Sequence, residues 1–242
     1  GRTPEHVAAA TLEDAERFYR RYYRPSNAIL SVSGDIEPEQ VFAMAERWFG
    51  EIPDTPAHHD PLPAEPMQTS ARRLEVDRDV PATAITIAFP MGGRLSRDYY
   101  LLDLISDLLS GGESARLYDS LIRRRRLFSA INAYITGDID PGMFIITGQI
   151  MEGVSEQQAE EALWENKFEA GVMFGELNVM NKAMNVGYYL MLGHPDLINS
   201  ETDIFRSINA YDIIRESRRI FRPELSSTLI YRKRQWDHAS PR

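Results

Sequence analysis

Hydrophobic and polar positions in the first fifty residues predict a helix, a strand and a second helix. Thr11 and the acidic residues after it are typical of a helix N-terminus, and an amphipathic run continues over 11–23. The apolar segment 28–33 predicts a short strand. Pro38 favours the start of a helix that runs to about Trp48.

The next stretch is rich in proline. Five prolines lie between Pro53 and Pro66, and such a composition favours extended, semi-rigid backbone over packed structure. We therefore expect a linker over 53–67.

The rest of the chain alternates between strand and helix patterns. Apolar alternation predicts strands over 72–77, 83–89, 127–136, 143–150 and 225–231. Helical periodicity predicts helices over 101–109, 114–126, 155–172, 176–192 and 211–221. The turn-rich segment 137–142 suits a hairpin. This order predicts an α+β fold with a mostly antiparallel sheet covered by helices on one face.

Composition narrows the functional classes. Thirty-six acidic and 27 basic residues give the 242-residue chain a formal charge of −9, which disfavours nucleic acid as a partner. The chain has no cysteine, so disulfides, thiolate metal sites and cysteine nucleophiles are excluded. The longest apolar candidate, 99–109, is too short and too charged for a membrane span. The compartment stays open, with the periplasm slightly favoured over the cytoplasm.

One segment of the chain is repeated. Residues 11–25 align with 209–223 at an offset of 198 (209 minus 11), and six of fifteen positions are identical. A predicted strand follows the Arg-Pro pair in both copies, which favours duplication over chance similarity between Arg-rich helices. If the second copy begins near Met67, roughly 130 residues of the first copy are missing upstream of Thr11.

Two blocks carry a family resemblance. They are FYRRYYRPSNAILSVSGDIEPEQVFAMAERWFGEIP, residues 18–53, and LLSGGESARLYDSLIRRRRLFSAINAY, residues 108–134. In order and spacing they resemble the pitrilysin/insulinase-type zinc metallopeptidases, which include mitochondrial processing peptidase and bacterial zinc proteases. The resemblance implies two similar α+β repeats. It divides the chain into the tail of the first repeat (1–52), the linker (53–67), a complete second, inactive-type repeat (68–235) and a tail (236–242).

The resemblance also implies what this chain lacks. Family members bind zinc through a His-x-x-Glu-His helix, and none of the five histidines is spaced in that way. We expect no metal and no catalytic residue in this chain, with zinc held by the missing upstream part or by a partner subunit. Active members carry a substrate-binding Arg and Tyr in the second repeat, and the alignment places Ile122 and Ser129 at those positions. The substrate-binding residues of this chain therefore stay unknown.

Four other patterns favour structural explanations. His58, His59 and Asp60 could ligate a metal, but neighbouring side chains in an extended linker point apart. The basic run 123–126 suits a helix end better than a phosphate site. The segment 111–114 lacks the lysine of a phosphate-binding loop and indicates a tight turn. The series Met180, Met184, Tyr188 and Met191 is more typical of a core.

These observations converge on one leading hypothesis. The chain is expected to be the C-terminal part of a zinc metalloendopeptidase-like protein that helps to enclose a peptide, and to be inactive alone. The alternatives are a non-catalytic scaffold subunit of a heterodimeric peptidase and, less favoured, an unrelated α+β binding module. Expected partners are the missing N-terminal part or a homologous subunit, with the peptide substrate and a homo- or heterodimeric assembly. The apolar surface of an incomplete first repeat is the reason for expecting dimerisation.

Overall fold

A computed structural model describes residues 3–54, 63–165 and 188–234. The chain divides into two compact units. One contains residues 1–65 and 175–199, and the other contains residues 66–174 and 200–242. Each unit is described by itself. In the described ranges, no helix is both long and apolar enough to cross a membrane.

The larger unit is built on a five-stranded sheet with the order β1-β5-β2-β4-β3. Its strands are β1 (Arg72–Arg78), β2 (Ala84–Pro90), β3 (Phe128–Ile135), β4 (Met143–Ile150) and β5 (Ser227–Lys233). The β1–β5 pair is parallel, and the β5–β2, β2–β4 and β4–β3 pairs are antiparallel. The predicted α+β fold with a mostly antiparallel sheet is confirmed.

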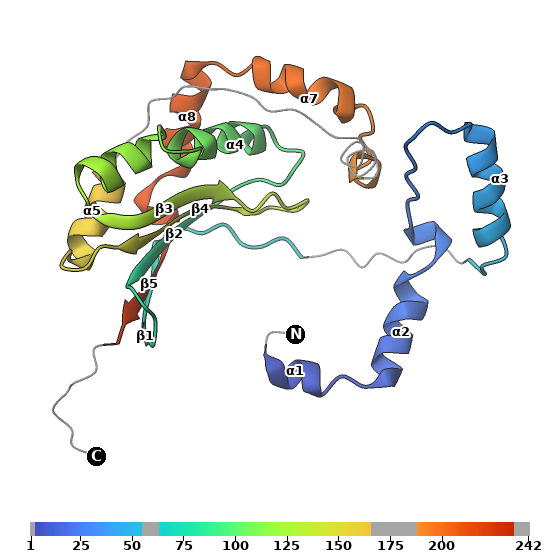
Figure 1. The fold of residues 1–242 in the computed structure, drawn as a ribbon, viewed down its shortest axis with the longest axis horizontal. Coiled ribbons are helices and arrows are strands. Elements are labelled where there is room, and N and C mark those ends of the chain that lie inside the picture. Colours follow the sequence, from blue (N-terminus) through green and yellow to red (C-terminus); the bar gives the residue numbers. More distant parts are fainter. Residues whose placement is uncertain (1–2, 55–62, 166–187, 235–242) are drawn as a thin grey trace. The chain divides into compact units, whose positions relative to one another are not determined.

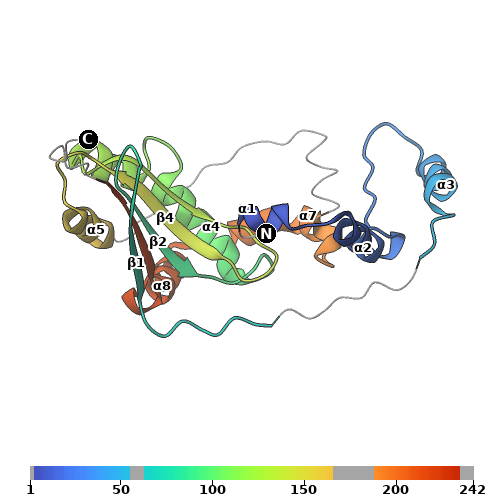
Figure 2. The same cartoon turned by 90° about the horizontal axis from the view of Figure 1, so that it is seen from below.

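Helices cover one face of this sheet. They are α4 (Arg97–Ser110), the π-helical η2 (Tyr118–Arg124), α5 (Glu156–Glu165), α8 (Ala210–Ile220) and the 3-10 turn η3 (Pro223–Leu225). A further helix, α7 (Leu197–Arg206), has its first residues in the other unit and contacts α4 through the rings of Phe205 and Tyr100. Figure 1 shows α4 above the strands, and in Figure 2, seen from below, the strands lie on the viewer's side of α4. No predicted element corresponds to α7.

The core lies between the sheet and these helices. Every second residue of β2 (Ile85, Ile87 and Phe89) is almost fully buried, as the alternating sequence pattern requires. From the other side, α4 contributes a stripe that includes Leu102 and Ile105, both fully buried. Each such side chain contributes about 1.5–3 kcal/mol to folding. The predicted stripe of α4 is therefore the main helical contribution to the core.

Two polar contacts attach helices to their neighbours. Arg219 of α8 donates a 2.8 Å hydrogen bond to Asp98 in the first turn of α4. At the other end of α4, the Ser110 hydroxyl accepts a hydrogen bond from the Ala133 N–H at 2.9 Å and lies 2.7 Å from the Ala133 carbonyl oxygen, to which it can donate. Because β3 is an edge strand, Ser110 satisfies backbone groups that no further strand pairs with.

Residues 3–54 of the smaller unit contain three helices and a 3-10 turn. They are α1 (Pro4–Ala8), α2 (Leu12–Tyr22), η1 (Pro25–Asn27) and α3 (Pro38–Phe49). The two helices predicted over 11–23 and 37–48 are confirmed, whereas α1 was not predicted. None of these four elements contains a buried residue.

The strand predicted over 28–33 is not formed. The segment is extended, but it pairs with no strand in the described ranges, and Ile29, Leu30 and Val32 are about half exposed. A β-strand is defined by hydrogen bonds to a neighbour, so strand propensity alone cannot produce one.

The remaining predictions concern the chain after β4. The helix predicted over 155–172 is described as far as Glu165. Most of the helix predicted over 176–192, with Met180 and Met184, lies outside the described residues, as do His58, His59 and Asp60. Tyr188 and Met191 lie in a short helical segment in which Met191 is 55% exposed, so Met191 is not a core residue in the described structure.

Candidate functional site: the helix-free face of the sheet

The candidate site is the sheet face of the larger unit that lies opposite its helices. The central row of residues on this face runs across all five strands, and each of its residues is paired in register with the next. This row consists of Leu74, Leu229, Thr86, Thr147 and Asn132. The row on one side consists of Val76, Tyr231, Ala84, Gln149 and Ala130, and the row on the other consists of Arg72, Ser227, Ala88, Ile145 and Tyr134. We call these fifteen residues the open face.

The open face carries one charged residue, Arg72 at the start of β1, and no carboxylate. Its other residues are apolar, aromatic, hydroxyl-bearing or amide-bearing, and its most exposed side chains include Leu74 (59%), Tyr134 (41%) and Tyr231 (38%). At its centre the Thr86 and Thr147 hydroxyls lie 2.8 Å apart and share a hydrogen bond. In a chain with a net charge of −9, a surface of this size without a carboxylate suits extended backbone and uncharged side chains better than a cationic ligand.

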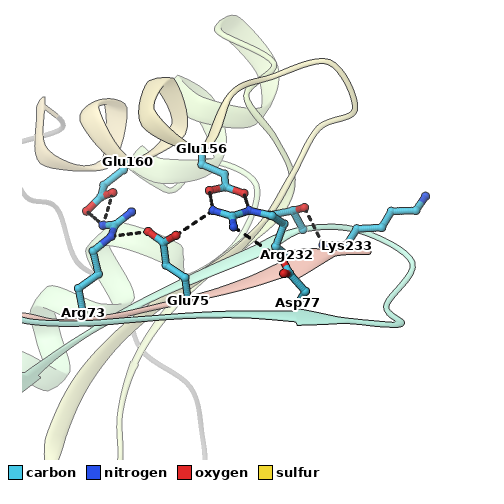
Figure 3. Close-up of polar contacts among 8 residues, drawn as sticks. Arg73, Glu75, Asp77, Glu156, Glu160, Arg232 and Lys233 are labelled. Carbon is cyan, nitrogen blue, oxygen red and sulfur yellow. Dashed lines mark hydrogen bonds and ion pairs between the residues drawn. The ribbon is translucent and has the colours of Figure 1, made fainter. Parts of the chain in front are cut away.

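The helix-covered face carries charge only near the outer edge of the sheet, where an ion-pair network fixes α5 (Figure 3). Arg232 of β5 makes two hydrogen bonds to Glu156, at 2.6 and 2.7 Å, and one to Glu75 of β1 at 2.9 Å. Arg73 binds Glu75 at 2.7 Å and Glu160 at 2.8 Å. Each arginine thus connects the parallel β1–β5 pair to α5.

The network shifts the titration of its members. Hydrogen bonds from Arg232 lower the pKa of Glu156, and hydrogen bonds from Arg73 and Arg232 lower the pKa of Glu75. The pKa of Arg232 is raised by the same partners. Every carboxylate of the group lies within ion-pair distance of an arginine, which indicates a structural clamp rather than a ligand site. Sequence reasoning did not find it, because β1 and β5 are far apart along the chain.

A second charged cluster lies around α4. Arg94 is 7% exposed, forms an ion pair with Glu201, and places its guanidinium carbon 4.4 Å from the Tyr99 ring centroid. Burial raises the pKa of Asp103 to about 6, and the nearby Asp107 adds to the effect. Such a group is a candidate for proton transfer only beside a substrate pocket. Asp103 and Arg94 instead lie among α4, Glu201 and core aromatics, which favours a structural role.

The two positions expected to have lost substrate contacts lie in different environments. Ile122 of η2 is half-buried and packs against the hydrophobic core. Ser129 is exposed at the start of β3, beside a register shift, and its hydroxyl lies 3.4 Å from the Gln149 carbonyl. Neither side chain belongs to the open face. In the neighbouring basic run, Arg124 pairs with Asp119 at 2.7 Å and Arg125 with Glu165 at 2.8 Å.

The described residues do not fit a zinc ion. Among residues 3–54, 63–165 and 188–234, no group of three or more His, Cys, Asp or Glu side chains could hold a metal. Two of the five histidines, His6 and His194, lie within these ranges. We therefore assign no chemical step to a metal on this chain.

Comparisons with known proteins place these features in context. Residues 9–166 match the family model described as the peptidase M16 inactive domain. The chain is 33% identical over 122 residues to the zinc protease PqqE of Helicobacter pylori, an alignment that covers 49% of this chain and 28% of the relative. A protease structure from Helicobacter pylori matches 95% of this chain and 61% of its own, with a TM-score of 0.79 and 19% identity.

A second solved structure, the periplasmic protease PqqL from Escherichia coli, matches 96% of this chain and 29% of its own, with a TM-score of 0.67 and 11% identity. The chain spans between 28% and 58% of the length of the curated relatives it matches. The relatives are thus considerably longer than the region they share with this chain.

Proposed function

Because the chain belongs to the peptidase M16 inactive-domain family, we propose that it forms the non-catalytic half of a zinc-dependent metalloendopeptidase and supplies one wall of the chamber that encloses the peptide. The family match across residues 9–166 is the observation that carries this proposal. Zinc belongs to the upstream half in this scheme, since the described residues offer no ligand cluster.

The open face is the proposed wall. An enclosed peptide must be held without regard to much of its sequence, and a broad surface with few charges achieves this through apolar contact and scattered hydrogen bonds. The hydroxyl pair of Thr86 and Thr147 and the amide groups of Asn132 and Gln149 supply the polar contacts. The face replaces the Arg and Tyr contacts that Ile122 and Ser129 cannot provide.

The domain limits follow from the same proposal. Residues 1–52 are the tail of the first repeat, 53–67 the linker, 68–235 the second repeat and 236–242 a terminal tail. The local structure at the ends of the two helices supports the duplication. The bounds of α8 lie 198 residues after those of α2, and the bounds of η3 lie 198 residues after those of η1.

Less support exists for the alternative of a purely scaffolding subunit, since curated relatives are described as zinc proteases. The periplasm is the proposed compartment, in line with the periplasmic PqqL neighbour. The apolar surface of the smaller unit is the one reason for proposing a dimer.

The first experiment compares this chain with the longer protein encoded by its gene. Both are purified and measured for bound zinc and for cleavage of a quenched fluorescent peptide library. We expect neither activity nor stoichiometric zinc in the 242-residue chain and both in the longer protein. Stoichiometric zinc with cleavage by the short chain would overturn the assignment, and a longer protein without either would favour the scaffold alternative.

The wall itself is tested in the longer protein by Thr86→Arg and Thr147→Arg. A charge at the centre of the open face should lower kcat/KM for uncharged peptides about tenfold or more, mainly through KM. Arg218→Trp, an equally drastic change at an exposed position of α8, is the matched control and should have no such effect. Equal kinetics in all three variants, with unchanged folding, would remove the open face from the proposal.

A further inference from the structure

The parallel strands β1 and β5 divide their charged residues between the two faces of the sheet. On the helix-covered face these residues pair with one another or with α5, and they are Arg73, Glu75, Asp77 and Arg232. Successive residues of a strand point to opposite faces, so the remaining charged residues of β1 and β5 lie on the side of the open face. They are Arg72, Arg78 and Lys233, and we call them the cationic rim.

The cationic rim is available to a ligand. All three side chains are exposed, and in the described ranges none of them pairs with a carboxylate, including that of Asp79, which follows β1. The Arg78 guanidinium donates a hydrogen bond to the Asp77 backbone carbonyl at 3.0 Å. Figure 3 shows the Lys233 side chain extending away from the ion-pair network. In a chain with a formal charge of −9, three exposed cations with no carboxylate on their side of β1 and β5 indicate affinity for an anionic ligand.

The cationic rim lies at two opposite ends of the open face. Arg78 and Lys233 are paired in register and lie beyond Val76, whereas Arg72 begins the row at the opposite end. Arg72 and Arg78 are six residues apart on one strand (78 minus 72), which corresponds to about 20 Å at about 3.3 Å per residue. Between them on this side lie Leu74 and Val76. Two cations at one end and one at the other thus flank an apolar stretch.

These dimensions match an extended peptide. A peptide segment of about seven residues also spans about 20 Å between its first and last Cα atoms, so carboxylates near both of its ends can reach both ends of the cationic rim. The middle of the peptide then meets Leu74, Val76 and Leu229, none of which is charged. A nucleic acid is a poorer match, because its evenly spaced phosphates would lie over this uncharged centre and the chain is acidic overall.

We propose that the open face selects extended peptides that carry carboxylates near both ends of the enclosed segment, and that Arg72, Arg78 and Lys233 determine this specificity. The inference rests on the proposed function, in which the open face encloses a peptide, and it adds the chemical class of that peptide. An arginine guanidinium can form two parallel hydrogen bonds with a carboxylate, whereas lysine supplies a point charge. Each exposed ion pair contributes little by itself, so the three together set the preference among peptides and apolar contacts supply the rest of the affinity.

The test measures peptide binding and needs no peptidase activity. Fluorescence anisotropy is recorded with the 242-residue chain and with the longer protein, whose zinc is chelated to prevent cleavage. The probes are short labelled peptides of one length with blocked termini, so that only their side chains carry charge. One peptide has two glutamates six positions apart, and a second has the same two glutamates adjacent at its centre. Two further peptides replace the separated glutamates with glutamines or with lysines.

Charge-reversal variants assign the effect to the cationic rim. Arg78→Glu combined with Lys233→Glu reverses the charge of the end that carries two cations. Arg218→Glu is the matched control, because Arg218 is an exposed arginine of α8 that forms no ion pair in the described ranges. Circular dichroism establishes that each variant is folded.

We expect the wild type to bind the peptide with separated glutamates about tenfold more tightly than its glutamine analogue at low ionic strength, and this preference should shrink at high salt. The peptide with adjacent glutamates should bind with intermediate affinity. The double variant should lose the preference for glutamate and favour the lysine peptide, whereas R218E should behave as the wild type. Equal affinities for the glutamate and glutamine peptides would overturn the proposal. Absence of binding, equal affinities for the two glutamate placements, or a preference that the double variant retains would overturn it as well.

The same peptides, offered to the longer protein with its zinc retained, report separately on the proposed function. Selective binding without cleavage would leave the specificity proposal standing while the proposed peptidase function failed. Cleavage that does not depend on the charge of the peptide would have the opposite meaning. The two failures are therefore distinguishable.

Discussion

Asp14 and Asp212 occupy the same position in two helices that begin 198 residues apart (210 minus 12). Each carboxylate accepts the N–H of its helix N-cap residue, Thr11 at 3.0 Å and Asn209 at 3.4 Å, and each pairs with an arginine three residues later. Their environments differ, because Asp212 is 6% exposed and Asp14 is exposed. The same local design is thus buried in one copy and exposed to solvent in the other.

This difference predicts unequal effects of removing the two carboxylates. Asp212→Ala should destabilise the larger unit by about 1–3 kcal/mol, because it removes a cap and leaves buried partners without a hydrogen bond. Urea unfolding followed by circular dichroism measures the change. Asp14→Ala is the matched control and should leave the unfolding of the larger unit unaltered. Similar losses for the two variants would contradict the assigned environments.

Asp103 predicts a pH-dependent stability. Burial raises the pKa of this carboxyl to about 6, so the fold favours its neutral form. The wild-type protein should therefore lose stability relative to Asp103→Asn as the pH rises from about 4 through 6. At about pH 8 the variant should be more stable by about 1–3 kcal/mol, and at about pH 4 the two should be equal.

Urea titrations at both pH values test this prediction. Asp107→Asn removes the smaller cause of the shift and should give a smaller gain in the same direction. A difference between Asp103→Asn and the wild type that does not change with pH would rule out the titration of Asp103 as its cause.

The Glu156–Arg232 pair predicts salt and acid sensitivity at the edge of the sheet. Hydrogen bonds from Arg232 lower the pKa of Glu156. The pair therefore stabilises the fold fully when the pH is above the ordinary pKa of glutamate, and this stabilisation is lost as the pH falls through the lowered pKa of Glu156 in the folded state. Glu156→Gln should reduce the melting temperature at low ionic strength and less at high salt. Arg222→Met, which breaks an exposed pair with Glu224, should have a smaller effect.

The Ser110 hydroxyl is expected to protect the backbone at the free edge of β3. Ser110→Ala should cost about 1 kcal/mol and accelerate hydrogen exchange of the Ala133 amide, because that N–H loses its partner. Ser110→Thr retains the hydroxyl and should restore protection. Exchange at Ala133 that is unchanged in Ser110→Ala would show that another group protects this amide.

Much of the fold could be predicted from local patterns. The alternation in 83–89 and the helical stripe that contains Leu102 and Ile105 each correspond to a buried face, because burial of one face requires that periodicity. The identical spacing around Arg24-Pro25 and Arg222-Pro223 predicted that the two helices end alike, and both are followed by 3-10 turns. The family resemblance was likewise readable from two sequence blocks.

Other features required the tertiary structure. Sequence alone predicted a strand over 28–33 because Ile29, Leu30 and Val32 favour one, yet no neighbour supplies hydrogen bonds in the described structure. The row from Leu74 to Asn132 and the ion pairs of Arg232 depend on which strands lie side by side. Strand order is set by pairing between distant segments, and paired residues such as Arg72 and Ser227 are 155 positions apart (227 minus 72).

The amino-acid sequence by itself determined the local elements, the repeat and the family of this protein, because helix caps, periodicity and motif spacing are properties of neighbouring residues. The tertiary structure decided which face of the sheet the helices leave uncovered and which charges pair with one another. The physical reason is that burial and ion pairing depend on distances between segments, and these distances exist only once the sheet has assembled.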